Sequence, residues 1–366
     1  MILLQPPVEI YLRGRGQRVL DADDFVLASR GGASPPRVTP ADALRVGDFV
    51  GVEYGAEWAV ASPPLPRQFE RDLYGSEKQI TIPDTMSAEL AFLLGAYLSE
   101  GHTTRRTWTV VITNSVETVL ERVQAAWFDI FGLQARITRQ PGKCPGVVVS
   151  SKRLVQWLSQ LGCGSRASDK AVPEVINWST REEVLAFLQG AALDAYTTHA
   201  NASSKWAICL ESAQAISQLQ DLLTRLGIVN SQIAKWNKKY LKHYHELYAA
   251  GPWGQDLCHL VPFLEPDKKA RALDYCELTF QSRSRDVIPG ITGPELRSLV
   301  PRGRNGRGGK GTGRQALNHL QDPRTRHVTR LSVQRAQQSG AQLPPWLEGV
   351  LLSGTRFVPI VDMRPT

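Results

Sequence analysis

The sequence predicts an α+β protein whose central part contains the same order of elements twice. Each copy gives a helix, a strand, a helix, two strands and a helix, first within residues 84–179 and then within residues 180–280. The helices that begin the two copies carry glycines at matching positions, Gly95 and Gly190, which lie 95 residues apart. Such a repeat indicates two similar halves related by a pseudo-twofold axis.

The elements of the first half follow from capping residues, hydrophobic period and glycines. Ser87 can cap a helix in which Leu90, Leu93 and Leu94 recur with the helical period, and Gly101 ends that helix. The elements expected after it are a strand over 107–114, a helix over 116–131, strands over 135–140 and 146–151, and a helix over 152–161.

The second half begins in the same way. Thr180 can cap a helix whose first turn carries Glu182 and Glu183, because acidic side chains suit the positive end of the helix dipole. This helix is expected to run to about Ala195. The elements expected after it are a strand over 204–212, a helix over 213–226, strands near 230–237 and 242–249, and a helix around 254–264.

Composition limits the class of protein. The chain has 366 residues, of which 42% are hydrophobic and 21% charged, and this length suits two or three domains. No apolar run approaches the roughly 18 residues of a membrane span, and the N-terminus lacks the pattern of a secretory signal. The five cysteines form no C-x-x-C pair, which argues against a disulfide framework or a zinc ribbon. We therefore expect a cytoplasmic, nucleoid-associated protein with no membrane partner.

The positive charge is concentrated near the C-terminus. The net charge is +8, and residues 281–335 carry twelve basic residues against three acidic ones, which favours a polyanionic partner such as nucleic acid. The Gly/Arg-rich stretch 301–314 cannot bury a core, so it is interpreted as a mobile basic loop. This loop is either a clamp on DNA phosphates or a solvated linker. Its candidate DNA-binding residues are Arg302, Arg304, Arg307, Lys310 and Arg314.

The two repeated helices carry acidic residues near their ends. The segment LLGAYLSEG (93–101) contains Glu100, and the segment FLQGAALDAYTT (187–198) contains Asp194. Small residues at Gly95, Gly190 and Ala191 would let the two helices approach closely and bring the acids together. Paired carboxylates beside phosphates are what Mg²⁺-dependent phosphodiester hydrolysis requires. The alternative is two core helices whose acids only end the last turn.

The first of these segments resembles a known signature. LLGAYLSEG is similar to the nine-residue motif of the LAGLIDADG homing endonucleases, with Gly95, Glu100 and Gly101 at the expected positions. The resemblance extends over roughly residues 85–280 and includes the order of elements in both halves. DKAVP (169–173) resembles the lysine block of intein endonucleases, and FLEPDKKARAL (263–273) resembles the corresponding block of the second half.

The resemblance implies a fold and an activity. The halves would be of the αββαβ type, with saddle-shaped antiparallel sheets, in a monomer with internal pseudo-twofold symmetry. The activity would be site-specific cleavage of a long asymmetric site in double-stranded DNA with Mg²⁺ as cofactor. The implied catalytic residues are Glu100, Asp194, Lys170, and either Lys268 or Lys269, with Glu100 and Asp194 as metal ligands.

The second motif departs from the family pattern. In the family the acid lies five residues after the glycine, as Glu100 does after Gly95, whereas five residues after Gly190 is Ala195. Asp194 lies one position early, and a one-residue shift turns a helical side chain by about 100°. A local distortion of the helix end would bring Asp194 into place. Without it, the protein would nick one strand, or would bind nucleic acid without cleaving it.

Basic residues on the predicted strands are candidates for DNA contact, because a twisted antiparallel ribbon fits the major groove. Arg136 and Arg139 would point to opposite faces of a regular strand, so only one of them need face DNA. The alternative for each residue is a solvated sheet face. The candidates in this group are Arg105, Arg106, Arg136, Arg139, Lys235, Lys238 and Lys239.

The flanks resemble a Hint protein-splicing domain. PADALRVGDFVGV (40–52) is similar to the Hint segment that follows the splicing histidine block, and TRFVPIVDM (355–363) is similar to the strand before the terminal splicing block. Asp21 and Asp24 stand where that domain has Thr and His, and the nucleophilic Cys or Ser and the terminal His-Asn are absent from this chain. The resemblance therefore implies a degenerate, trimmed or split intein without autonomous splicing. Its parts would be a Hint-like β segment over 1–66, a basic DNA-contacting extension over 281–345 and a C-terminal Hint-like strand over 346–366.

Overall fold

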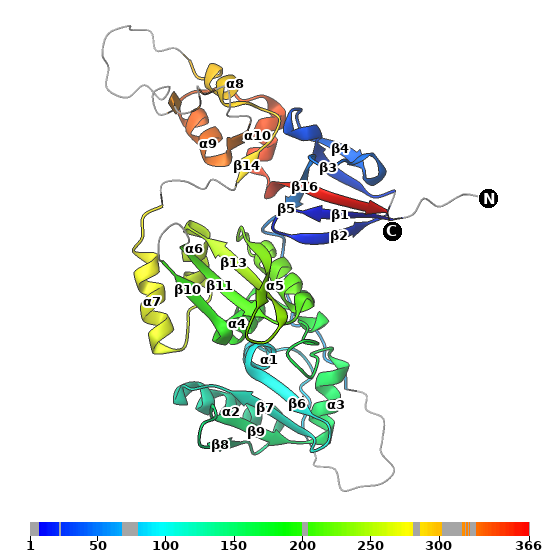
Figure 1. The fold of residues 1–366 in the computed structure, drawn as a ribbon, viewed down its shortest axis with the longest axis vertical. Helices are drawn as coiled ribbons and strands as arrows, with labels where there is room; N and C mark the ends of the chain where they lie inside the picture. The colour runs from blue at the N-terminus through cyan, green and yellow to red at the C-terminus, as the bar shows by residue number, and fades with distance from the viewer. Residues whose placement is uncertain are drawn as a thin grey trace, which may run out of the picture. The chain divides into compact units, whose positions relative to one another are not determined.

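The computed structural model describes residues 7–21, 23–67, 80–199, 204–280, 286–301, 317–318, 320, 322 and 327–365. The chain forms two compact units. Unit 1 contains Met1–Ala56, Thr224–Val229 and Phe280–Thr366, and unit 2 contains Glu57–Leu223 and Asn230–Thr279. In Figure 1, unit 2 is mostly drawn from cyan to yellow, and unit 1 takes both ends of the colour range.

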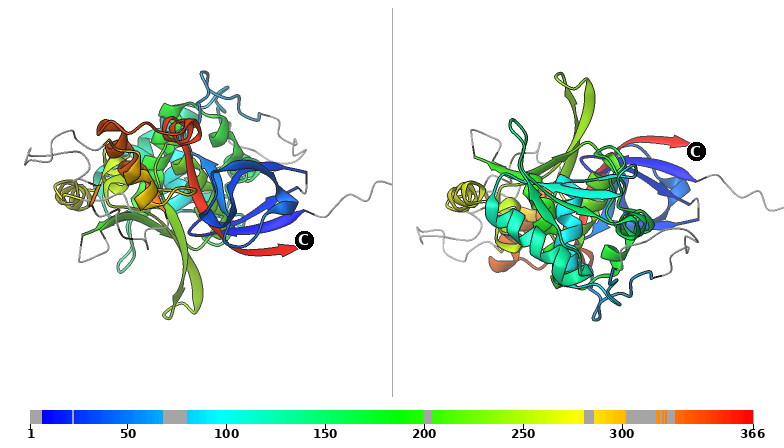
Figure 2. Two further views of the ribbon diagram at one scale, coloured as in Figure 1. Left: turned by 90° about the horizontal axis from the view of Figure 1, so that it is seen from above. Right: turned by 90° about the horizontal axis from the view of Figure 1, so that it is seen from below.

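Unit 2 contains two runs of elements with the same sheet topology. The first run is α1 (Ala88–Glu100), β6 (Gly101–Thr104), β7 (Thr109–Thr113), α2 (Glu117–Phe131), β8 (Arg136–Thr138), β9 (Gly146–Ser150) and α3 (Lys152–Gln160). The second is α4 (Arg181–Ala191), the 3₁₀ turn η4 (Ala192–Asp194), β10 (Ala195–Thr198), β11 (Lys205–Leu210), α5 (Ala213–Arg225), β12 (Ser231–Asn237), β13 (Lys242–Ala250), α6 (Pro252–Leu260) and α7 (Pro266–Cys276). The antiparallel sheets have the orders β6-β7-β9-β8 and β10-β11-β13-β12. Figure 2 shows the β12–β13 hairpin, in yellow-green, as a curved two-stranded ribbon.

Local chemistry sets the ends of these elements. The Ser87 hydroxyl accepts a hydrogen bond from the Leu90 N–H at 3.2 Å, and Thr180 forms a capping box with Glu183, so both predicted helix starts are confirmed. Gly132 ends α2 in the left-handed conformation. The short strands β6 and β10 were not predicted, because β6 follows α1 and β10 follows η4 with no intervening residue.

The helices α1 and α4 pack against each other through their glycines. A Cβ atom added to Gly95 would overlap the carbonyl oxygen of Phe187, and one added to Gly190 would overlap that of Phe92. The Ser99 hydroxyl donates a hydrogen bond across the contact to the Gly190 carbonyl at 3.2 Å. The expected close approach of the two helices is therefore present, and it requires hydrogen at both glycine positions.

Unit 1 contains one six-stranded antiparallel sheet in the order β2-β1-β16-β5-β3-β4. Its strands are β1 (Val8–Leu12), β2 (Gly16–Leu20), β3 (Phe25–Ser29), β4 (Arg37–Pro40), β5 (Phe49–Glu53) and β16 (Thr355–Pro365). The last strand of the chain therefore lies between two strands from its beginning, and Ile10, Val50 and Ile360 from these three strands share one buried cluster. The short turns η1 (Arg30–Gly32) and η2 (Ala41–Ala43) flank β4.

The C-terminal part of unit 1 is more helical than expected. It contains β14 (Val287–Ile288), α8 (Gly293–Ser298), β15 (Val328–Thr329), α9 (Arg330–Gln338) and α10 (Pro345–Leu352). Ile288, Leu296, Val333 and Leu347 form a buried core, against which Phe49 packs. The predicted C-terminal strand over 346–366 is thus a helix as far as Leu352, and β16 begins only at Thr355. The sequence did not predict this core, because its apolar residues are scattered among basic ones. The predicted loop residues 302–314 lie outside the described residues.

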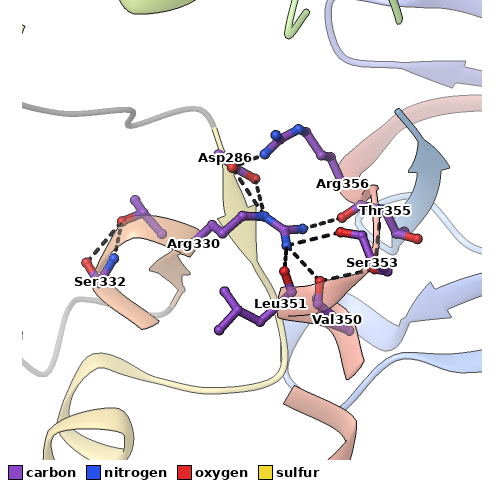
Figure 3. A network of polar contacts seen from close by, with 9 residues as sticks. Asp286, Arg330, Ser332, Val350, Leu351, Ser353, Thr355 and Arg356 are labelled. Carbon is purple, nitrogen blue, oxygen red and sulfur yellow. Dashed lines mark hydrogen bonds and ion pairs between the residues drawn. The ribbon is translucent and has the colours of Figure 1, made fainter. Parts of the chain in front are cut away.

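Arg330 joins the helices of this part to the sheet, as Figure 3 shows. Its guanidinium is buried beside Asp286 and donates to four backbone carbonyls at the end of α10 and the start of β16. The acceptors are Val350 (2.7 Å), Leu351 (2.8 Å), Ser353 (3.3 Å) and Thr355 (2.5 Å). The carbonyls that end an α-helix lack partners within the helix, so Arg330 satisfies those of α10.

Within the described ranges, no helix combines the length and apolar character that crossing a membrane requires.

Candidate metal centre and active site

Two carboxylates stand at equivalent ends of the paired helices. Glu100 is the last residue of α1, and β6 begins at the next residue. Asp194 is the last residue of η4, and β10 begins at the next residue. Although Asp194 is one position early when counted from its glycine, it therefore occupies the same place as Glu100 at the junction of helix and strand.

The 3₁₀ turn η4 accounts for this agreement. From Gly95 to Glu100 the chain takes five α-helical steps, which rise about 7.5 Å and turn about 500°. From Gly190 to Asp194 it takes one α-helical step and three 3₁₀ steps, which also rise about 7.5 Å and turn about 460°. The side chains therefore differ in direction by about 40° instead of about 100°. The distortion on which the prediction of Asp194 depended is present.

The two acids influence each other electrostatically. Burial raises the pKa of Glu100 to about 7, and the neighbouring charge of Asp194 adds to this effect. The Lys268 ammonium and a hydrogen bond from Thr113 Oγ1 to Glu100 Oε2 (3.3 Å) act in the opposite direction. Desolvation also raises the pKa of Asp194, opposed by Lys268 and Lys170. Asp194 is nevertheless exposed enough to meet a ligand from solvent.

A lysine binds the carbonyl end of each helix. The buried Lys170 ammonium donates to the carbonyls of Tyr97, Leu98 (3.1 Å) and Gly101 (2.5 Å) around the end of α1. Burial lowers the pKa of Lys170 to about 8.

The Lys268 ammonium donates to the carbonyl of Leu193 in η4 at 2.5 Å and pairs with Glu265 Oε1 at 2.9 Å. Lys269, the other candidate for this half, is exposed on α7, and the lysine that reaches the helix end is Lys268.

These residues fit a divalent cation. Carboxylate oxygens are the ligands that Mg²⁺ and Ca²⁺ prefer, and burial raises the pKa values of the acids at both helix ends, which a bound cation would lower. The buried Glu265 Oε2, close enough for its charge to act on both acids, has no hydrogen-bond partner. No group of three or more His, Cys, Asp or Glu among the described residues is arranged to hold a metal. A cation at Glu100 and Asp194 would therefore take its remaining ligands from water and from the substrate.

The first of these helices lies inside a recognised family segment. Residues 87–162 match the family model of the LAGLIDADG-like domain. Among curated proteins, a chain of the A-type ATP synthase of Pyrococcus abyssi is 30% identical over 155 residues, which is 41% of this chain and 15% of that protein. The chain thus corresponds to a small part of that relative.

Solved structures show more distant likenesses. Mesophilic variants of the homing endonuclease I-DmoI give a TM-score of 0.37 with 16% identity over 48% of this chain and 94% of theirs. I-DmoI in complex with DNA and Ca gives a TM-score of 0.38 with 17% identity, covering 51% of this chain and 97% of that one. Full-length DUF199/WhiA from Thermatoga maritima gives a TM-score of 0.38 with 10% identity over 73% and 86%. At TM-scores below 0.5 these likenesses assign no function.

The LAGLIDADG-like segment presents one sheet face away from its helices. In β7, Val110 and Ile112 are buried, whereas Val111 points to the opposite face, which we call the open face. Arg136 pairs with Val148, which in turn pairs with Val111, so Arg136 also lies on the open face. Arg139 follows β8 and forms an ion pair with Glu117 of α2 at 2.5 Å. Of these two arginines, the open face contains Arg136.

The other basic candidates lie at several places. Arg105 and Arg106 are exposed between β6 and β7, and Lys238 and Lys239 are exposed between β12 and β13. Lys235 forms an ion pair with Glu246, a residue that no motif in the sequence marks. Arg302, Arg304, Arg307, Lys310 and Arg314 lie outside the described residues.

Sequence reasoning also missed Glu265. Its position three residues before Lys268, ahead of a proline that begins a helix, was the available signal.

Proposed function

We propose that this protein is a site-specific endonuclease that cleaves a long asymmetric site in double-stranded DNA by Mg²⁺-dependent phosphodiester hydrolysis. The observation that carries the proposal is the equivalent position of Glu100 and Asp194 at the ends of two closely packed helices, each with a lysine on its terminal carbonyls. The family match over residues 87–162 supports it. The net charge of +8 is consistent with a DNA partner.

Each site residue has a role in this proposal. Glu100 and Asp194 would hold the divalent cation, which supplies a polarised water and neutralises charge on the phosphate and the leaving oxygen. Glu100 has to lose its proton to serve as a ligand, and its pKa of about 7 makes this step sensitive to pH near neutrality. Lys170 and Lys268 bind the helix-end carbonyls, and their charges favour the ionised form of Asp194.

The proposal includes the organisation of the protein. Both carboxylates come from one chain and both sheets have the same strand order, so a monomer with internal pseudo-twofold symmetry would supply two similar active sites. We also propose an intein origin, since β16 lies between β1 and β5 and the endonuclease core is inserted between these strands in the sequence. A cytoplasmic, nucleoid-associated location follows from a DNA substrate.

A nickase of the same fold is the second candidate. Asp194 ends a 3₁₀ turn and is followed by Ala195, whereas Glu100 is followed by Gly101, so the two sites differ in their residues as well as in side-chain direction by about 40°. If this difference disables the second site, only one strand will be cut. If both sites are disabled, the protein will bind DNA without cleavage.

The deciding experiment selects sites from a random duplex pool in Ca²⁺ and then adds Mg²⁺, with each strand resolved on a denaturing gel. Cuts in both strands that are lost in Glu100→Gln and Asp194→Asn support the proposal. Glu182→Gln, an exposed acid in the first turn of α4, is the matched control and should cleave normally. Full cleavage by Glu100→Gln contradicts the site assignment, and a cut in one strand supports the nickase. Absence of both selective binding and cleavage refutes the function.

A further inference from the structure

A second group of charged side chains lies on the sheet of the second half. Its centre is Glu246 of β13, whose side chain is only 1% exposed. One donor comes from each of the other three strands of the sheet. They are the Tyr196 hydroxyl of β10, the Lys205 ammonium of β11 and the Lys235 ammonium of β12, each at 2.5 Å from a carboxylate oxygen.

This group lies on the open face of its sheet. In β13, Leu247 and Ala249 are buried in the core, so Glu246 points to the opposite face. In β11, the core residues Trp206 and Ile208 place Lys205 on that same opposite face. The lysine side chains remain 18% exposed for Lys205 and 46% exposed for Lys235. The carboxylate is thus covered by side chains that themselves reach solvent.

The group combines two positive charges with one negative charge. Burial would raise the pKa of Glu246, but the hydrogen bonds from Lys205, Lys235 and Tyr196 outweigh it and hold the pKa below its ordinary value. Glu246 is therefore ionised at neutral pH. Charge-assisted hydrogen bonds of this kind fix long side chains in one geometry. Lys205 also lies over the ring of Tyr248 at 5.0 Å, which restricts it further.

We propose that Glu246 is a positioning residue that fixes Lys205 and Lys235 on the open face and restrains the affinity of that face for DNA of any sequence. The inference rests on the proposed function, because it presumes duplex DNA as the ligand. A lysine that neutralises a phosphate releases counterions and adds affinity without sequence information. Because Glu246 already balances part of their charge, Lys205 and Lys235 add less of this affinity. They add it only where a DNA phosphate lies within reach of their fixed ammonium groups.

The test compares the salt dependence of binding for wild type and Glu246→Gln on a labelled random-sequence duplex in EDTA. One further phosphate contact should steepen the slope of log K against log salt by about 0.9 and tighten binding roughly eightfold at 0.1 M salt. Glu117→Gln is the matched control, because it removes the acid from an equally short ion pair beside the first sheet. Arg139, the partner of Glu117, follows the end of β8 and does not lie on the open face with Arg136. The slope of log K against log salt for Glu117→Gln should therefore equal that of wild type.

The double variant Lys205→Met with Glu246→Gln keeps the net charge of wild type. It removes Glu246 together with the more buried of its two lysines, so no buried ammonium loses its carboxylate partner. Its preference for a selected site over the random duplex should fall about fivefold or more, because Lys235 is no longer fixed.

Three results overturn the inference: an unchanged slope in folded Glu246→Gln, an equal increase in Glu117→Gln, or undiminished preference in the double variant. If the wild type binds no duplex, the proposed function fails and the inference fails with it. Binding by the wild type together with any of the three results overturns the inference alone.

Discussion

Replacing Glu100 with Gln should stabilise the protein in the absence of divalent cations, by an amount that grows between pH 4.5 and pH 7 and is complete above pH 7. The folded-state pKa of Glu100 is about 7, against an ordinary value of 4.5. A carboxyl with a raised pKa does not affect stability below pH 4.5, where it is neutral in both states. As pH rises, the unfolded chain ionises first, so wild type loses stability until the folded state also ionises near pH 7. The loss is about 1 kcal/mol at pH 5 and about 3 kcal/mol at pH 8, and Gln, which does not titrate, avoids it.

Urea unfolding in EDTA at pH 5 and pH 8, followed by tryptophan fluorescence, measures this difference. Eight of the nine tryptophans lie in unit 2, so the signal reports the unit that contains Glu100. Glu100→Gln should exceed wild type by about 2 kcal/mol more at pH 8 than at pH 5. Glu182→Gln, far from the carboxylate pair, should follow the wild-type pH dependence. If Glu100→Gln shows the same pH dependence as wild type, the pKa of Glu100 is not raised and our account of the site is incorrect.

Four further predictions follow from the contacts described above. Gly190→Ala should cost about 3 kcal/mol or more in urea unfolding because its Cβ would overlap backbone of α1, whereas Gly349→Ala, which has open space in α10, should be neutral or stabilising. Calorimetric Ca²⁺ affinity should fall about tenfold from pH 8 to pH 6, with proton release on binding, because Glu100 is mostly protonated at pH 6; equal affinities would contradict this. Lys268→Met should move the pH profile of cleavage to higher pH, because Lys268 lowers the pKa of both acids; an unmoved profile would remove Lys268 from the site. Arg330→Leu should cost about 3 kcal/mol or more in unfolding of unit 1, since it leaves several carbonyls without their buried donor and removes one of the two arginines that pair with Asp286; a chain of unchanged stability would show that water replaces the guanidinium.

Features that depend on neighbouring residues were predictable from the sequence. Capping residues and helical period predicted the bounds of α1 and the start of α4, and the two glycines predicted their close packing. The predicted end of the second helix near Ala195 was wrong, because α4 ends at Ala191 and a 3₁₀ turn follows it. The place of Asp194 could not be decided, because nothing in AALDA distinguishes an α-helical turn from a 3₁₀ turn. Whether Lys268 or Lys269 reaches the end of η4 depends on the orientation of α7, and only the tertiary structure gives this orientation.

Features that depend on pairing across the sheet were not predictable. Glu246 meets Lys205, Lys235 and Tyr196 only because four strands come into register, and these residues are separated by up to 50 positions in the chain. The core around Leu296 and Leu347 was similarly hidden, because its residues are scattered among basic ones and become neighbours only through the packing of α8, α9 and α10.

The pairing of β1 with β16 brings two points that are far apart in the chain next to each other. Val8 pairs with Pro365, so the start of the first strand and the end of the last are neighbours in one antiparallel ladder. Neighbouring strands lie about 5 Å apart, a separation that a short stretch of any surface loop already spans. Segments attached before Val8 and after Pro365 would therefore begin side by side at one end of the sheet.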